Sequence, residues 1–154
     1  MRAENLHVTL KFLGEVAEAR VDVVRSELGE IRSDNVVALE FRGLGFFPNE
    51  KHPRVFWAGM EASPNLKTLA GDIEGAMEKL GIPREKREFS PHLTLARLER
   101  PRLPEALRKL IADNQQREFG SLQTKEFHLI QSKLKPSGAE YTTVATFQFA
   151  PNVE

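Results

Sequence analysis

The feature that most constrains the fold is a tetrad that occurs twice in nearly identical form, HVTL at residues 7–10 and HLTL at residues 92–95. Both tetrads lie in segments where apolar residues alternate with polar ones, which is typical of a β-strand buried on one side. With the chain's content of His and Thr, chance gives roughly 0.2 occurrences of H-x-T. Two occurrences, both extended to H-x-T-L, therefore predict a fold with two similar halves.

The expected elements support this repeat. Aligned on the tetrads, the halves share the order strand, helix, tetrad strand, helix, strand, but the first half lacks the first two members. We therefore expect a strand and a helix to be missing ahead of His7. The hydrophobic periodicity and the turn residues predict strands at 6–13, 36–48, 54–60, 89–98, 126–134 and 141–149, and helices at about 17–32, 64–80 and 104–112.

These elements predict an α+β fold. We expect two pseudo-symmetric lobes of mainly antiparallel β-sheet, with outer helices and a central cleft, in a single bilobal domain over 1–154. The repeat halves would cover about 1–50 and 51–154.

The composition limits the function. Lys plus Arg and Asp plus Glu both number 22, so a nucleic-acid binder of this kind must concentrate its cations in a small pocket or groove. The absence of cysteine excludes disulfides, thiolate catalysis and cysteine-ligated zinc. No secretion signal and no apolar run of membrane-spanning length is seen, so we expect a cytoplasmic protein without a membrane partner.

The paired tetrads indicate a chemistry. Residues i and i+2 of a strand share a face, so each tetrad presents a His beside a Thr. Two imidazoles and two hydroxyls in one cleft suit in-line phosphoryl chemistry: one imidazole takes a proton from water, and the other gives a proton to the departing sugar oxygen. We expect no metal and no cofactor, because His7 and His92 have no third ligand at a suitable spacing.

Four segments carry a resemblance to a known family: ENLHVTLKFLGEV, GLGFFPNEKHPRVFWAGM, FSPHLTLAR and SKLKPSGAEY. They are similar to the 2′-5′ RNA ligase / RNA 2′,3′-cyclic phosphodiesterase family of the two-histidine phosphoesterases, over essentially the whole chain. Members of that family begin with a strand and a helix ahead of ENLH. The resemblance implies metal-independent hydrolysis of RNA 2′,3′-cyclic phosphate ends to a 2′-phosphate, with 2′-5′ ligation as a side activity. The partners would be tRNA-like or other short RNA ends, with no obligate protein partner.

The same resemblance assigns roles to residues. His7 would be the acid that protonates the leaving O3′, and His92 the base that activates water. Thr9 and Thr94 would hydrogen-bond the phosphate oxygens, and Arg97 would neutralise phosphate charge. Arg97 has the strand parity of Leu93 and Leu95, so it reaches the site only if the strand contains a bulge or ends after Leu95.

Further contacts are weaker hypotheses. Phe12 and Phe47 have the chemistry to stack on a terminal base. The parity of Phe12 favours core packing. Tyr141 is either a structural hydrogen-bonding residue or a ligand contact. His52 and His128 lack a Thr two residues later, and we expect neither to be catalytic. The cations that would line the cleft are Lys11, Arg54, Lys133 and Lys135.

Two other functions remain open from the residues. One is the same reaction on a small cyclic nucleotide or on ADP-ribose cyclic phosphate. The other is a non-catalytic binder of RNA ends, which the loss of a tetrad His or Thr would have indicated. All four of those side chains are present.

Overall fold

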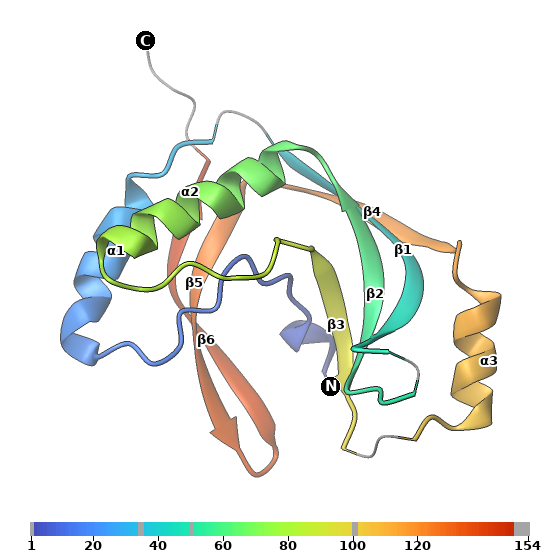
Figure 1. The fold of residues 1–154 in the computed structure, drawn as a ribbon. Helices are drawn as coiled ribbons and strands as arrows, with labels where there is room; N and C mark the ends of the chain where they lie inside the picture. The colour runs from blue at the N-terminus through green and yellow to red at the C-terminus, as the bar shows by residue number, and fades with distance from the viewer. Residues whose placement is uncertain (1, 34–35, 50, 100–101, 150–154) are drawn as a thin grey trace. The chain divides into compact units, whose positions relative to one another are not determined.

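The computed structural model describes residues 2–33, 36–49, 51–99 and 102–149, and it confirms the α+β class (Figure 1). The helices are α1 (Val21–Gly29), α2 (Asn65–Lys79) and α3 (Glu105–Asp113), with short 3₁₀ turns at η1 (Ala3–Asn5) and η2 (Glu18–Arg20). The strands are β1 (Val37–Phe47), β2 (Val55–Ala62), β3 (His92–Arg97), β4 (Glu118–Thr124), β5 (Glu126–Lys135) and β6 (Gly138–Gln148).

The described chain divides into two compact units, each made of three separate stretches. Unit 1 contains the segment up to Thr9, Leu39–Ala62 and Pro91–Leu122. Unit 2 contains Leu10–Ala38, Ser63–Ser90 and the chain from Gln123 onward. The segment with His7 and Thr9 therefore belongs to the same unit as β3, which carries His92 and Thr94.

The main sheet has the strand order β3-β2-β1-β4, and β2 pairs antiparallel with both β1 and β3. Apolar residues on one side of β1 and β2 form its buried face, with Phe46 and Ala58 among the most buried. The register of β1 shifts between Phe41 and Leu44, so Arg42 and Gly43 together face Gly59 of β2. This bulge locally kinks β1.

Unit 2 has its own core, between α1, α2 and the β5–β6 hairpin. Met77 is fully buried at its centre, and Phe127 stacks on Phe147 with ring centroids 5.0 Å apart. Burying an apolar side chain of this size contributes roughly 1.5–3 kcal/mol. The β5–β6 hairpin has its turn at the predicted position: Pro136 and Ser137 lie between the paired residues Lys135 and Gly138.

The prediction of a strand at 6–13 is wrong. These residues are outside any strand or helix, and Phe12, expected in the core by its parity, is 77% exposed. Instead Leu10, Leu13 and Val16 pack against the core of unit 2, at a spacing of three. A β-strand needs a hydrogen-bonded neighbour, and no strand in the described ranges pairs with this segment.

The sequence analysis missed β4. It is an edge strand next to β1, and nearly all of its side chains are exposed, including Phe119 and Leu122. Without a buried face there is no apolar alternation to detect, so the strand depends on its pairing with β1.

We expect opposite effects from two glycine-to-alanine substitutions. A Cβ at Gly59 would lie 2.4 Å from the carbonyl oxygen of Arg42, so Gly59→Ala should lower the free energy of unfolding by about 1–3 kcal/mol. At Gly71, in the middle of α2, a Cβ would have no atom within 4 Å. Gly71→Ala should therefore raise the free energy of unfolding by about 0.5–1 kcal/mol. Urea unfolding of both variants checks this, and a stable Gly59→Ala would contradict the close approach at the bulge.

Candidate active site

A β-bulge in β3 brings Arg97 to the same face as the second tetrad. Along β3, His92 is opposite Gly59, Thr94 is opposite Trp57, and Arg97 is opposite Val55, while the register shifts between Thr94 and Ala96. Val55, Trp57 and Gly59 alternate along β2 and share a face. The three β3 side chains paired with them therefore share that face too, which we call the catalytic face. This is the bulge that the sequence analysis named as a condition for Arg97 to reach the site.

The first tetrad is positioned by a short turn rather than by a sheet. In η1, the backbone N–H of Leu6 donates to the carbonyl of Ala3 at 3.1 Å. His7 Nδ1 lies 2.7 Å from the carbonyl oxygen of Asn5. A carbonyl oxygen only accepts, so Nδ1 carries the hydrogen and donates it. In the neutral ring Nε2 is then the nitrogen without a hydrogen.

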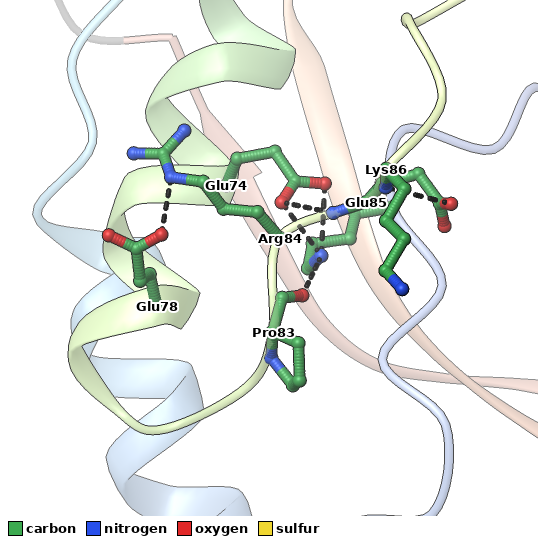
Figure 2. A network of polar contacts seen from close by, with 7 residues as sticks. Glu74, Glu78, Pro83, Arg84, Glu85 and Lys86 are labelled. Carbon is green, nitrogen blue, oxygen red and sulfur yellow. Dashed lines mark hydrogen bonds and ion pairs between the residues drawn. The ribbon is translucent and has the colours of Figure 1, made fainter.

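Lys11, predicted as an RNA contact, lies in a buried network in unit 2 with Glu74 and Pro83, which are labelled in Figure 2. Its Nζ donates to both carboxylate oxygens of Glu74 at 2.9 Å and to the carbonyl of Pro83 at 3.0 Å. The Lys11 side chain is only 4% exposed. Because an ammonium group has three N–H donors, these contacts use all of them. Lys11 therefore anchors the chain two residues after Thr9, and we do not assign it to RNA binding.

The backbone of Glu85 adds to this network. Its N–H donates to Glu74 Oε2 at 3.1 Å, so the carboxylate of Glu74 holds both the ammonium of Lys11 and the loop after α2. Beside it, Arg84 Nε pairs with the carboxylate of Glu78 at 2.5 Å (Figure 2).

Phe47 and Arg54 lie next to the Arg97 end of the catalytic face. Phe47 ends β1 opposite Val55, which is also opposite Arg97, and it is 48% exposed. Arg54 is exposed and comes directly before β2. Its backbone N–H donates to the carbonyl of Phe47 at 2.9 Å, and its own carbonyl accepts from the N–H of Leu98 at 2.8 Å. Both residues belong to unit 1, as do His7, Thr9, His92 and Thr94.

Of the remaining residues discussed in the sequence analysis, His52 belongs to unit 1. The others belong to unit 2: Lys133, Lys135, Tyr141 and His128. Tyr141 is half-buried on β6 opposite Ser132, and Lys135 pairs with Glu140 at 2.5 Å, while Lys133 is exposed. His128 Nδ1 lies 3.0 Å from the hydroxyl of Thr146. His52 is exposed in the turn before β2, where its backbone N–H donates to the side-chain oxygen of Asn49 at 3.0 Å.

The sequence analysis missed Trp57. It lies on the catalytic face directly opposite Thr94, and its indole covers Gly45 on the neighbouring strand, where a Cβ would be 2.4 Å from Cζ2. In the sequence, the available signal was Gly59, two residues after the only tryptophan. The nearness of Gly45 follows only from its pairing with Trp57. Arg42 lies near this ring, and its hydrogen bond with Glu40 raises the pKa of its guanidinium.

These residues have the chemistry needed for proton transfer around an oxyanion. An imidazole, a hydroxyl and a guanidinium share one face of β3, and a second imidazole and hydroxyl come from the segment at His7 in the same unit. Donors of this kind stabilise phosphate oxygens, and two imidazoles supply an acid and a base. Among the residues that the structure describes, no three His, Asp or Glu side chains are grouped to hold a metal ion, and no helix is long and apolar enough to span a membrane.

The α+β fold and the two H-x-T segments define a two-histidine phosphoesterase. Residues 1–136 match the 2′-5′ RNA ligase superfamily, and the chain belongs to this family. A relative in Archaeoglobus fulgidus, named RNA 2′,3′-cyclic phosphodiesterase, is 36% identical over 94% of this chain and 80% of its own length. The relative of the same name in Aquifex aeolicus is 37% identical over 94% of this chain and 78% of its own.

Solved structures agree with this assignment. A protein of Thermus thermophilus superimposes with a TM-score of 0.78 at 32% identity, over 96% of this chain and 80% of its own. The E. coli protein LigT, in complex with 3′-AMP, superimposes with a TM-score of 0.74 at 28% identity, over 96% of this chain and 79% of its own.

Proposed function

We propose that this chain is a phosphodiesterase that opens RNA 2′,3′-cyclic phosphate ends to a 2′-phosphate, with His7 as acid and His92 as base. The observation that carries the proposal is the register of β3, which presents His92, Thr94 and Arg97 together on one face. The relatives named RNA 2′,3′-cyclic phosphodiesterase, at 36% and 37% identity, support the substrate class.

The reaction has one bond made and one bond broken at phosphorus. His92 takes a proton from water, and the water oxygen forms a new bond to phosphorus. The bond from phosphorus to O3′ breaks, and His7 Nε2 gives its proton to O3′, so the protons balance. The hydroxyls of Thr9 and Thr94 donate to the non-bridging oxygens, and the guanidinium of Arg97 offsets their negative charge.

The same residues can run the reaction in reverse, with a 5′-hydroxyl in the place of water. Water at about 55 M favours hydrolysis unless the protein orients the second RNA end, which well-placed groups achieve through a high effective molarity. We therefore propose ligation only as a side activity. The substrates we propose are tRNA-like or other short RNAs that end in a cyclic phosphate.

A product analysis tests the function. A short RNA ending in a 2′,3′-cyclic phosphate is incubated with the chelator-treated protein, and the product is separated by chromatography. We expect opening to a 2′-phosphate at an unchanged rate after chelation. A 3′-phosphate product would reverse the choice of leaving oxygen. Binding of the RNA without turnover would contradict the proposal and favour a binder of RNA ends.

A further inference from the structure

The two H-x-T tetrads are held in place by different means. All four residues of the second tetrad lie in β3, which pairs with β2. The first tetrad lies outside the described strands and helices, so no ladder of backbone hydrogen bonds in those ranges fixes Thr9. Thr9 is exposed, and the chain bends at the next residue, Leu10. A hydroxyl that binds a phosphate oxygen needs a fixed position, which for Thr9 has to come from other contacts.

The chain is fixed again at Lys11, two residues after Thr9. The ammonium group of Lys11 donates to both carboxylate oxygens of Glu74 on α2 and to the carbonyl of Pro83 in the loop that follows (Figure 2). The side chains of Lys11 and Glu74 are only 4% and 17% exposed, and a pair this buried is screened little by solvent. Three bonds in different directions therefore determine where Nζ of Lys11 lies.

The surroundings of Lys11 make these bonds the directional part of the anchor. Leu10 and Leu13, on either side of Lys11, pack against the core of unit 2. Apolar burial is non-directional and holds the segment without specifying its exact position, whereas hydrogen bonds have preferred angles. The acceptor is itself held, because Glu74 lies within α2 and its Oε2 also accepts the backbone N–H of Glu85 at 3.1 Å.

The covalent chain is short enough to carry this position from Lys11 to Thr9. The Cα atoms of residues two positions apart are at most roughly 7 Å apart, and the peptide units between them are planar. A displacement of Lys11 therefore moves Thr9 by a similar amount. Misplacing a group in an active site by about 1 Å can lower the rate by about 10²-fold.

We propose that Lys11, held by Glu74, is a positioning residue that fixes the hydroxyl of Thr9 for the non-bridging oxygens of the cyclic phosphate. The inference rests on the proposed function for what Thr9 binds, but the placement of Thr9 does not depend on turnover. Positioning is separable from stability, because apolar residues often replace a buried ion pair without loss of stability. Lys11→Met/Glu74→Leu makes this replacement and removes the directional bonds.

Backbone order parameters from ¹⁵N relaxation provide the first test. We expect the order parameter of the Thr9 amide to fall from about 0.85 in wild type to below about 0.6 in Lys11→Met/Glu74→Leu, the change from rigid to flexible backbone. The amide of Thr94 in β3 should stay near about 0.85 in both proteins, which also shows that the variant is folded.

The same double substitution at an exposed ion pair is the matched control. Lys67→Met/Glu88→Leu alters a pair whose side chains are 72% and 82% exposed, and it should leave the order parameter of Thr9 unchanged. Equal values for Thr9 in wild type and Lys11→Met/Glu74→Leu would overturn the proposal. A value below about 0.6 in wild type would overturn it without any variant. Since no turnover is needed, these outcomes decide the positioning even if the proposed hydrolysis fails.

A kinetic cycle provides the second test, on a short RNA with a 2′,3′-cyclic phosphate end. We expect Lys11→Met/Glu74→Leu to lower kcat by about 10–10²-fold, although the variant is folded. In a Thr9→Val background the same double substitution should lower kcat by no more than about twofold, because the hydroxyl that it misplaces is already absent. In a Thr94→Val background the full loss should remain. A full loss in both backgrounds, or wild-type kcat in the folded double variant, would overturn the assignment.

Discussion

We expect His7→Ala and His92→Ala each to lower kcat on a cyclic-phosphate RNA by about 10²–10⁴-fold, with the protein still folded. The size follows from the usual contribution of one general acid or base. Both side chains are exposed, so their truncation leaves no cavity in a core. Single-turnover rates on a short RNA with a 2′,3′-cyclic phosphate end, together with circular dichroism of each variant, measure this effect.

The other two histidines of the chain are the controls. His52→Ala and His128→Ala should keep wild-type rates, because neither residue lies on the catalytic face. The pH–rate profile then assigns the roles. In His92→Ala, which lacks the proposed base, we expect the rate no longer to fall at low pH. In His7→Ala, which lacks the proposed acid, we expect the rate no longer to fall at high pH. Full activity in either variant would contradict the two-histidine mechanism.

We expect Glu74→Ala to lower the free energy of unfolding by about 3–5 kcal/mol. The substitution removes the carboxylate from Lys11, whose side chain is 4% exposed, and a buried charge without its partner costs about this much. It also removes the acceptor for the backbone N–H of Glu85. Urea unfolding monitored by circular dichroism gives the change in stability.

An exposed ion pair of the same composition is the control. Lys67 and Glu88 are paired at 3.1 Å with side chains 72% and 82% exposed, so Glu88→Ala should change the stability by less than about 1 kcal/mol. The double substitution Lys11→Met/Glu74→Leu replaces both charged side chains by apolar ones. It should therefore recover much of the stability lost in Glu74→Ala, because no buried charge is left without a partner. Equal effects of Glu74→Ala and Glu88→Ala would show that the buried network does not stabilise the chain.

Local patterns were sufficient for most elements. Helices α2 and α3 and strands β2, β5 and β6 lie within a few residues of the predicted ranges. In α2 the apolar periodicity corresponds to a buried face that includes Leu66, Leu69, Ile73 and Met77. Prediction from apolar periodicity failed where the buried residues did not follow the alternation in the sequence. The segment around Phe12 alternates like a strand but has no partner strand, and β4 is a strand with no buried face.

The sequence by itself determined the family of this protein, and it supplied the residues of the proposed chemistry: two His and two Thr in repeated tetrads, with no cysteine. Only the tertiary structure decided which of the remaining side chains share a face. The bulge in β3 turns Arg97 toward the side of His92, and the carboxylate of Glu74 engages Lys11. The strand register sets Trp57 opposite Thr94, and its ring lies over Gly45. These outcomes depend on pairing register and on contacts between residues far apart in the chain. Residue type and local spacing carry no information about either.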